Sequence, residues 1–245
     1  MTNVSQLARP HLRSLLMHVP DGILDAPTSV GTAVVATIGV GLALRGARRE
    51  LDDRTAPLAG LVALFVFASQ MLKFPVAAGT SGHLLGGALA AVLIGPWTAT
   101  LALAVVLLVQ SLAFADGGVT ALGTNVTLLG IVGVWVGWLV FVGVRALLPK
   151  RPASVVPAAA AGALVSVPAA ALVFTALFAI GGQVPVPLDR LAAAMVGVHT
   201  LIGVGEAVIT ALAVSSIVAV RPDLVHGARR TLAQRPLTIR EKVPA

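Results

Sequence analysis

The sequence predicts an all-α integral membrane protein with about seven transmembrane helices. Only 11% of its 245 residues are charged and 57% are hydrophobic, whereas soluble domains carry about 25% charged residues. The mean hydropathy is +0.96. The chain also contains long runs without Asp, Glu, Lys or Arg. These runs are continuously apolar instead of alternating, which favours helices over a β-barrel.

The first four spans follow from the charge-free runs. Residues 26–44 hold 19 uncharged positions and residues 55–72 hold 18, and about 20 apolar residues cross a bilayer as a helix. Residues 74–115 give 42 uncharged positions, which is room for two helices. We expect a break at Gly95-Pro96, because proline cannot continue a helical hydrogen-bond ladder. The third helix, at about 82–94, is then short.

Three further spans complete the count. Residues 117–144 form the fifth, and residues 152–188 the sixth, which ends at Gly181-Gly182 before Pro185 and Pro187. The last span, about 193–220, contains a single acid, Glu206. Small residues are frequent in these segments, and they permit close helix contacts in lipid.

The basic residues predict the orientation. With seven spans, 13 of the 17 Lys and Arg residues fall on one side, and Arg9, Arg13, Lys73 and Arg190 fall on the other. Cytoplasmic loops carry the excess of Lys and Arg, so we expect a cytoplasmic C-terminus and an outer N-terminus in a bacterial-type plasma membrane. The net charge of +7 is thus explained by the basic residues of the cytoplasmic loops and tail, and it does not indicate nucleic-acid binding. Residues 221–245 form a basic cytoplasmic tail.

Polar residues within membrane segments indicate function. The candidates are His18, Asp21, Gln70, Ser81, His83, Gln110, Asp116, Asn125, His199 and Glu206. Most of them cluster near the outer side, where glycine-rich connections suggest a compact site for a small cation. The chain has no Cys, so thiolate ligands and thiolate nucleophiles are excluded. A phosphate-binding loop of the G-x-x-x-x-G-K-[ST] type is also missing from the sequence, so any ATP hydrolysis requires another chain.

Met17 and His18 suggest a particular metal chemistry. If translation begins at Met17, its free amine, the His18 amide nitrogen and the His18 Nδ1 form two adjacent chelate rings in one plane. A fourth nitrogen from His83 would complete a square-planar site, the geometry of Ni(II) or Cu(II), which Co(II) can also adopt. Binding displaces protons from the amine and the amide, so metal affinity should rise with pH.

Several motifs together resemble the CbiM/NikM family, the substrate-capture membrane subunits of energy-coupling-factor ABC importers for cobalt and nickel. The motifs occur in the expected order between residues 17 and 220: MHVPDGIL at 17–24, FPV at 74–76, GTSGHLLGG at 79–87, GPW at 95–97, FADGG at 114–118, GTN at 123–125 and HTLIGVGEAVIT at 199–210.

The resemblance implies seven helices, an extracellular N-terminus inserted into the bundle, and a metal held by Met17, His18 and His83. It also implies a transmembrane coupling subunit and two ATPase subunits as partners, and it allows a small accessory membrane subunit. The chain itself would be no enzyme and would carry Co(II) or Ni(II) as cargo without a resident cofactor. The residues do not decide between cobalt and nickel.

Residues 1–16 depart from the family pattern, because an attached extension would remove the free amine of Met17. We expect an upstream start codon assigned in error, which leaves a membrane domain at 17–220. A signal peptide is not expected, because Leu15-Leu16 is too short an apolar core.

The other polar residues receive supporting roles. Asp21, Gln70, Ser81, Asp116 and Asn125 are expected to orient the ligands, and Gln70, Gln110 and Asn125 to form interhelical hydrogen bonds. His199 and Glu206 lie seven residues apart on one helix face. They could form a structural pair, contact another subunit or act as a relay, in which case the chain would be a proton-coupled secondary transporter. A membrane-embedded metalloenzyme, such as an intramembrane protease, is a rival from another class. It would need His and acid pairs at H-E-x-x-H spacing or paired catalytic aspartates, and neither occurs here.

Overall fold

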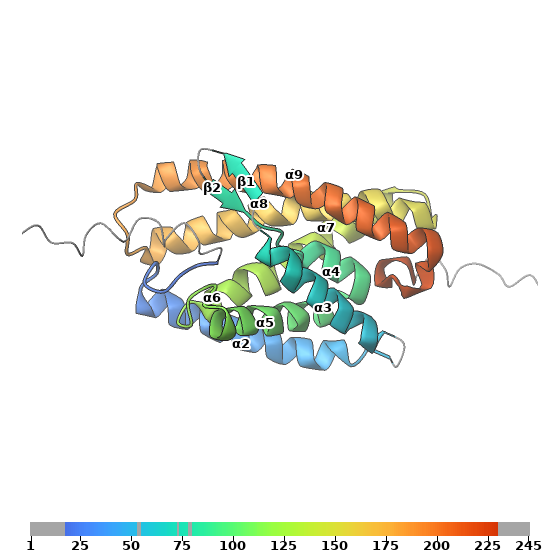
Figure 1. Ribbon diagram of the computed structural model, residues 1–245, viewed down its shortest axis with the longest axis horizontal. Helices are drawn as coiled ribbons and strands as arrows, with labels where there is room; N and C mark the ends of the chain where they lie inside the picture. Colours follow the sequence, from blue (N-terminus) through green and yellow to red (C-terminus); the bar gives the residue numbers. More distant parts are fainter. Residues whose placement is uncertain (1–17, 53–54, 73, 78–79, 230–245) are drawn as a thin grey trace, which may run out of the picture.

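The structure, a computed structural model, describes residues 18–52, 55–72, 74–77 and 80–229. The described helices run roughly along one common axis and form an elongated bundle (Figure 1). The α9 helix packs against α8, α8 against α7, and α2 against α5. The bounds of the helices, in chain order, are α2 Ala26–Ala47, α3 Ala56–Met71, α4 Gly87–Ile94, α5 Pro96–Ala113, α6 Leu122–Asn125, α7 Val134–Leu147, α8 Val155–Gly181 and α9 Leu188–Val220.

The all-α membrane class is confirmed, and most of the predicted spans recur as helices. Within the described residues, five helical segments are long and apolar enough to cross a membrane: α2, α5, the continuous segment Leu122–Leu147, Pro152–Gly181 and α9. The α3 helix has 16 residues and α4 has eight. The number of actual crossings and the orientation of the termini stay predictions.

The predicted break at Gly95-Pro96 is present. Gly95 has a φ of +92° and Pro96 opens α5, because proline fits the first turn of a helix but not its interior. The last helix begins at Leu188, earlier than the expected residue 193. The charge-free run excluded Asp189 and Arg190, yet an acid in the first turn is favourable at a helix N-terminus.

A short hairpin follows α3 that the sequence did not predict. Strands β1 (Phe74–Ala77) and β2 (Thr80–Gly82) pair antiparallel, with Phe74 opposite Gly82 and Pro75 opposite Ser81. The hairpin lies against α9 (Figure 1). Strands of three and four residues are too short to give a clear alternating pattern, so this segment looked like a plain connection.

Large apolar side chains cover much of the outside of the bundle. Leu61, Leu64 and Leu212 are each more than 60% exposed, and Ile180 is 76% exposed. A soluble monomer rarely exposes so much contiguous apolar surface, whereas a bilayer solvates it. The chain is therefore a multi-pass membrane protein.

Small residues bring the inner helices together. A Cβ atom on Gly162 of α8 would lie 2.6 Å from the carbonyl oxygen of Gly137 in α7, and one on Gly137 would lie 2.9 Å from the Cα of Ala88 in α4. Only glycine permits these approaches of three helices, as is common where apolar lipid gives no hydrophobic drive for association.

A segment of π-helix, η2 (Val126–Gly133), joins α6 to α7. Such segments are rare and often occur at functional sites. Here η2 directly follows Asn125, and two of its residues, Leu128 and Leu129, line the cavity described below.

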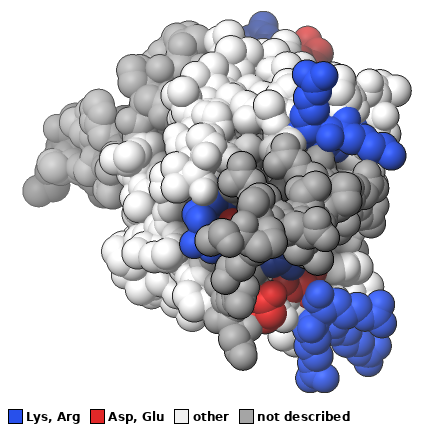
Figure 2. All heavy atoms as spheres, turned by 90° about the vertical axis from the view of Figure 1, so that its right-hand side faces the viewer, with Lys and Arg blue, Asp and Glu red and all other residues white. Residues whose placement is uncertain are grey.

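One end of the bundle carries the basic residues, and we call it the basic end. It holds the C-terminus of α2, the N-terminus of α5 and the C-terminus of α9, and Figure 2 shows Lys and Arg gathered on it. The Glu50 carboxylate accepts hydrogen bonds from the backbone N–H of Trp97 (3.2 Å) and of Thr98 (2.8 Å). This buried acid, which caps the N-terminus of α5, was not predicted from the sequence.

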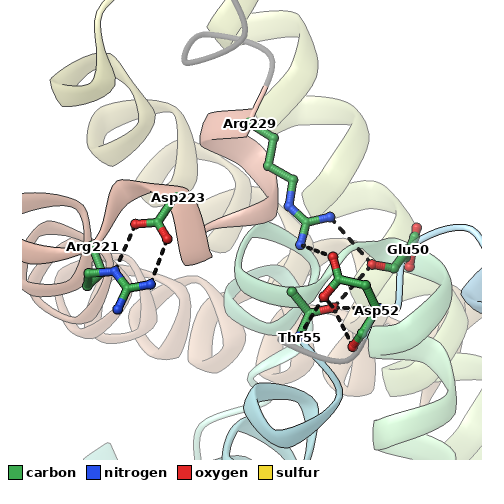
Figure 3. A network of polar contacts seen from close by, with 6 residues as sticks. All are labelled: Glu50, Asp52, Thr55, Arg221, Asp223 and Arg229. Carbon is green, nitrogen blue, oxygen red and sulfur yellow. Dashed lines mark hydrogen bonds and ion pairs between the residues drawn. The ribbon is translucent and has the colours of Figure 1, made fainter.

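The C-terminal segment is joined to the same end. The Arg229 guanidinium lies 4.0 Å from Asp52 and 3.5 Å from the Glu50 carbonyl oxygen (Figure 3). Arg221 pairs with Asp223 at 2.7 Å, and this pairing raises the pKa of Arg221. The contacts of Arg229 connect the chain beyond α9 to the loop between α2 and α3.

Candidate metal centre

A cavity of about 240 Å³ lies between the N-terminal segment, η2, α8 and α9. Most of its wall is apolar. The polar side chains on it are His18, His83, Asn125 and His199. Three imidazoles on one small apolar cavity are an unusual concentration of nitrogen donors. All three belong to segments that carry the sequence motifs described above.

The N-terminal segment enters the bundle and is held there by backbone contacts. The Asn125 side chain accepts from the Val19 N–H (2.9 Å) and donates to the Val19 carbonyl (3.1 Å). The Gly118 N–H donates to the same carbonyl at 3.0 Å. Because Val19 follows His18 directly, these three bonds fix the position of His18.

Asp21 strengthens this attachment. One of its carboxylate oxygens accepts from the Thr120 N–H (2.8 Å), the Thr120 hydroxyl and the Ala121 N–H (3.3 Å). The Thr120 hydroxyl lowers the pKa of Asp21, so the carboxylate is charged at neutral pH. Helix α2 is capped by a different acid, Asp25, which accepts from the Thr28 N–H at 2.9 Å. Asp21 thus joins the N-terminal segment to residues 120–121.

His18 is buried beside an acid. Its side chain is 1% exposed, and its Nδ1 lies 3.5 Å from the Asp116 carboxylate. Among the described residues its Nε2 has no hydrogen-bond partner. Gly117 allows His18 to lie this close to the segment that carries Asp116, since a Cβ at Gly117 would lie 2.9 Å from the Cβ of His18. Gly117 also has a φ of +88°, a conformation that favours glycine.

His83 faces His18 across the site. The two ring centroids are 5.0 Å apart, with the rings inclined by 52°. The Nδ1 of His83 lies 3.0 Å from the Leu84 carbonyl oxygen. A carbonyl only accepts, so this bond places the proton on Nδ1 and the lone pair on Nε2. That is the tautomer in which Nε2 binds a metal ion.

Two predicted site residues cannot be placed in full. Met17 lies outside the described residues, and so does the extension 1–16. Ser81 belongs to β2, but its side chain lies outside the described part. In the part of the chain that the structure describes, no group of three His, Asp or Glu side chains is arranged to hold a metal ion. Two histidines alone therefore need further donors, such as backbone nitrogen.

Of the hydrogen bonds predicted for Gln70, Gln110 and Asn125, those of Gln70 and Asn125 have partners in the structure. Gln70 of α3 donates from Nε2 to the Leu85 carbonyl at 2.9 Å, and Asn125 holds Val19 as described. Gln110 of α5 is fully buried, and neither of its side-chain polar atoms has a hydrogen-bond partner among the described residues. The interhelical hydrogen bond expected for Gln110 is therefore not found there.

His199 and Glu206 are bonded separately to different segments. His199 directs Nδ1 at the Met195 carbonyl (2.7 Å), one turn earlier in α9, and its side chain lines the cavity. The Glu206 carboxylate accepts from the backbone N–H groups of Leu85 (2.9 Å) and Gly86 (3.0 Å). Although the two residues share a helix face, they have different partners and form no acid–imidazole pair.

Sequence reasoning missed Thr120 and Gly117 as parts of this site. Thr120 reads as an ordinary loop residue, because its partner Asp21 lies 99 positions away. Gly117 is part of the Asp-Gly-Gly sequence, which indicates a turn but not the close approach to His18.

Comparisons with known proteins identify the family of the chain. Residues 18–224 match the family described as CbiM, cobalt uptake substrate-specific transmembrane region. A Haloquadratum walsbyi protein named for metal transport is 38% identical over 211 residues, 85% of this chain and 93% of that protein. A fused nickel transport protein, NikMN, of Rhodobacter capsulatus is 33% identical over 231 residues, 89% of this chain and 66% of that protein.

A solved structure has the same fold. The crystal structure of a truncated transition metal transporter superimposes with a TM-score of 0.75 at 28% identity, covering 83% of this chain and 99% of that one.

Proposed function

The chain belongs to the CbiM family of substrate-specific transmembrane proteins of cobalt uptake, and from this premise we propose that it captures Co(II) or Ni(II) for an ATP-driven importer. It is a membrane component of cobalt or nickel transport and no enzyme. The metal ion is its cargo. Relatives named for nickel transport as well as for metal transport leave both ions as candidates.

The facing pair of His18 and His83 carries the proposal. Both side chains are buried on one cavity, 5.0 Å apart between ring centroids, and His83 has the tautomer with a lone pair on Nε2. In the proposed site, His18 gives Nδ1 and its amide nitrogen, His83 gives Nε2, and Met17 gives its amine. Four nitrogens in a plane suit Ni(II) and are accessible to Co(II).

Charge balance supports the same arrangement. A divalent ion bound by one deprotonated amide has a net charge of +1, and the Asp116 carboxylate lies 3.5 Å from His18 Nδ1. With Asp116 the site is close to neutral, which matters because an isolated charge is costly in apolar surroundings. Asp116 then acts beside the site without ligating the metal.

The transport step depends on other chains. We propose a transmembrane coupling subunit and two ATPase subunits as partners, with the metal site near the outer face and the basic end in the cytoplasm. Residues 17–220 are proposed as the membrane domain and 221–245 as a cytoplasmic tail.

The test is metal binding by purified protein from two expression starts, one at Met1 and one at Met17. We expect one Ni(II) per chain for the Met17 start, with loss of binding in His18→Ala and His83→Ala. His226→Ala is the matched control, because His226 lies at the opposite end against Trp138. Stoichiometric binding that survives in both site variants would refute the site, and equal binding by the extended chain would refute the amine ligand.

A second candidate is proton-coupled transport through His199, which lines the same cavity. Metal uptake by cells that persists after ATP depletion, collapses with the proton gradient and is lost in His199→Ala would favour this alternative. Uptake that follows ATP and survives dissipation of the gradient would exclude it.

A further inference from the structure

We propose that Glu206 is a positioning residue for the metal site, acting on His83 through the peptide group between Leu84 and Leu85. The inference rests on the proposed function, because it assumes that His83 binds the metal. It assigns Glu206 a task different from proton relay and from subunit contact.

The need for such a residue arises from α4. This helix has eight residues and is therefore only about 12 Å long, less than half of the roughly 30 Å thickness of the apolar layer. It ends at Ile94, just before Pro96 opens α5 at the basic end, so its N-terminus lies at mid-depth in the bundle (Figure 1). The first N–H groups of a helix have no partner within it, and without water they must be satisfied by protein.

Glu206 meets this need from the middle of α9. Its side chain is fully buried, and its two oxygens accept separately from the Leu85 N–H (2.9 Å) and the Gly86 N–H (3.0 Å). Gly86 is the N-cap of α4, with a φ of +76°. A carboxylate with both oxygens occupied at a helix N-terminus is a strong, directional contact.

One peptide group connects this contact to the imidazole. His83 Nδ1 lies 3.0 Å from the Leu84 carbonyl oxygen, and the N–H of the same peptide group donates to Glu206. A peptide group is planar, so fixing its N–H fixes the direction of its carbonyl. The carboxylate therefore sets the orientation of the His83 ring across one rigid unit.

The same connection affects the chemistry of the ring. Hydrogen bonds in a chain polarise one another, so a carboxylate at the N–H makes the Leu84 carbonyl a better acceptor. A stronger bond at Nδ1 makes Nε2 a better donor to a metal ion. Imidazole, peptide and carboxylate thus take the place of the direct carboxylate–histidine contact common in metal sites.

Gln70 holds the next peptide group from the other side. Its Nε2 donates to the Leu85 carbonyl at 2.9 Å, so α3 and α9 together enclose residues 84–86. Contacts from two helices explain how a segment without regular structure keeps His83 opposite His18.

The experiment compares Glu206→Gln with wild type in Ni(II) titration and in the visible absorption of the bound ion. Glutamine keeps one acceptor oxygen but turns an NH2 group toward a backbone N–H. We expect Ni(II) affinity to fall by about 10- to 100-fold, the range for lost partners of metal ligands, with a shifted absorption band. Glu206→Asp keeps the charge on a shorter side chain and should recover part of the affinity.

Thr210→Val is the matched control. Thr210 is fully buried one turn further along α9, and its hydroxyl has no hydrogen-bond partner among the described residues. Wild-type affinity and spectrum in this variant are expected. Titrations are run well below the unfolding temperature of each metal-free variant, so that loss of fold is not read as loss of affinity.

Each outcome separates this inference from the proposed function. If His83→Ala abolishes binding and Glu206→Gln keeps wild-type affinity and spectrum, the positioning role is overturned while the metal site stands. If His83→Ala itself retains binding, the proposed site fails first. If Glu206→Gln does not fold, Glu206→Asp decides alone. Its shorter side chain cannot reach both N–H groups without shifting the peptide group between Leu84 and Leu85, so an affinity and a spectrum identical to wild type would overturn the role.

Discussion

Asn125 and Asp21 show that polar side chains in this membrane protein form hydrogen bonds with backbone groups of distant segments. Asn125 meets both the N–H and the carbonyl of Val19, and Asp21 meets the N–H groups of residues 120 and 121. An extended segment inside a bundle leaves its peptide groups without partners, which is costly in apolar surroundings. The side chains that satisfy them also fix His18.

At this scale the sequence predicted which residues gather but not how they are bonded. His18, His83 and Asn125 come together on one cavity, because each stands in a polar, glycine-rich segment between apolar runs. The bonds themselves depend on residue pairs about 100 or more positions apart, such as Val19 with Asn125 and Leu85 with Glu206. Local patterns carry no information on such pairs.

Gly117→Ala should weaken metal binding. A methyl group there would lie 2.9 Å from the His18 Cβ and 3.1 Å from the Asn125 side-chain nitrogen, so His18 must move. We expect Ni(II) affinity to fall by roughly 10-fold or more, as for other disturbances next to a metal ligand, measured by calorimetric titration.

Gly22→Ala is the control for backbone strain in that comparison. Gly22 also has a positive φ, +79°, but a Cβ there meets nothing within 4 Å. It should lose stability and keep its metal affinity. Equal loss of affinity in both variants would show that strain, and not displacement of His18, is responsible.

At the scale of elements, the short helix α4 explains how residues without regular structure find a place inside a bundle of long helices. It has only eight residues, and residues 83–86, which precede it, have no regular structure. The break at Gly95-Pro96 was predictable, because proline and glycine act locally. The start of α4 at Gly87, instead of the expected residue 82, was not, because the N–H of its N-cap Gly86 is bonded to Glu206, 120 residues later in the chain.

Gly162→Ala should destabilise the packing of α7 on α8. The added carbon would lie 2.6 Å from the Gly137 carbonyl oxygen, and overpacking of this kind costs about 1–3 kcal/mol. We expect a lower unfolding temperature in detergent, measured by following the intrinsic Trp fluorescence on heating. Gly143→Ala in α7 meets nothing within 4 Å and should leave this temperature unchanged or slightly higher, since alanine favours a helix.

At the scale of the whole molecule, composition alone predicted the class, because polar residues are too few to cover a soluble surface of this size. The exposed apolar exterior and the solved transporter fold agree with it. The count of crossings stays a prediction, since α3, with 16 residues, and α4, with eight, are shorter than a bilayer is thick. Charge predicts the orientation: described basic residues concentrate at the basic end (Figure 2), and Arg190 lies near the start of α9, at the other end.

Single cysteines can test this orientation, because the chain has no native Cys. Ala153, in a short 3₁₀ helix (Pro152–Ser154), and Val186, in the loop before α9, are exposed residues at opposite ends of α8. If the basic end is cytoplasmic, a membrane-impermeant maleimide should label Val186→Cys in intact spheroplasts and should label Ala153→Cys only after lysis. Labelling of Ala153→Cys before lysis, with Val186→Cys protected, would invert the protein. The cavity between His18 and His83 would then open to the cytoplasm, a position from which it could not capture metal for import.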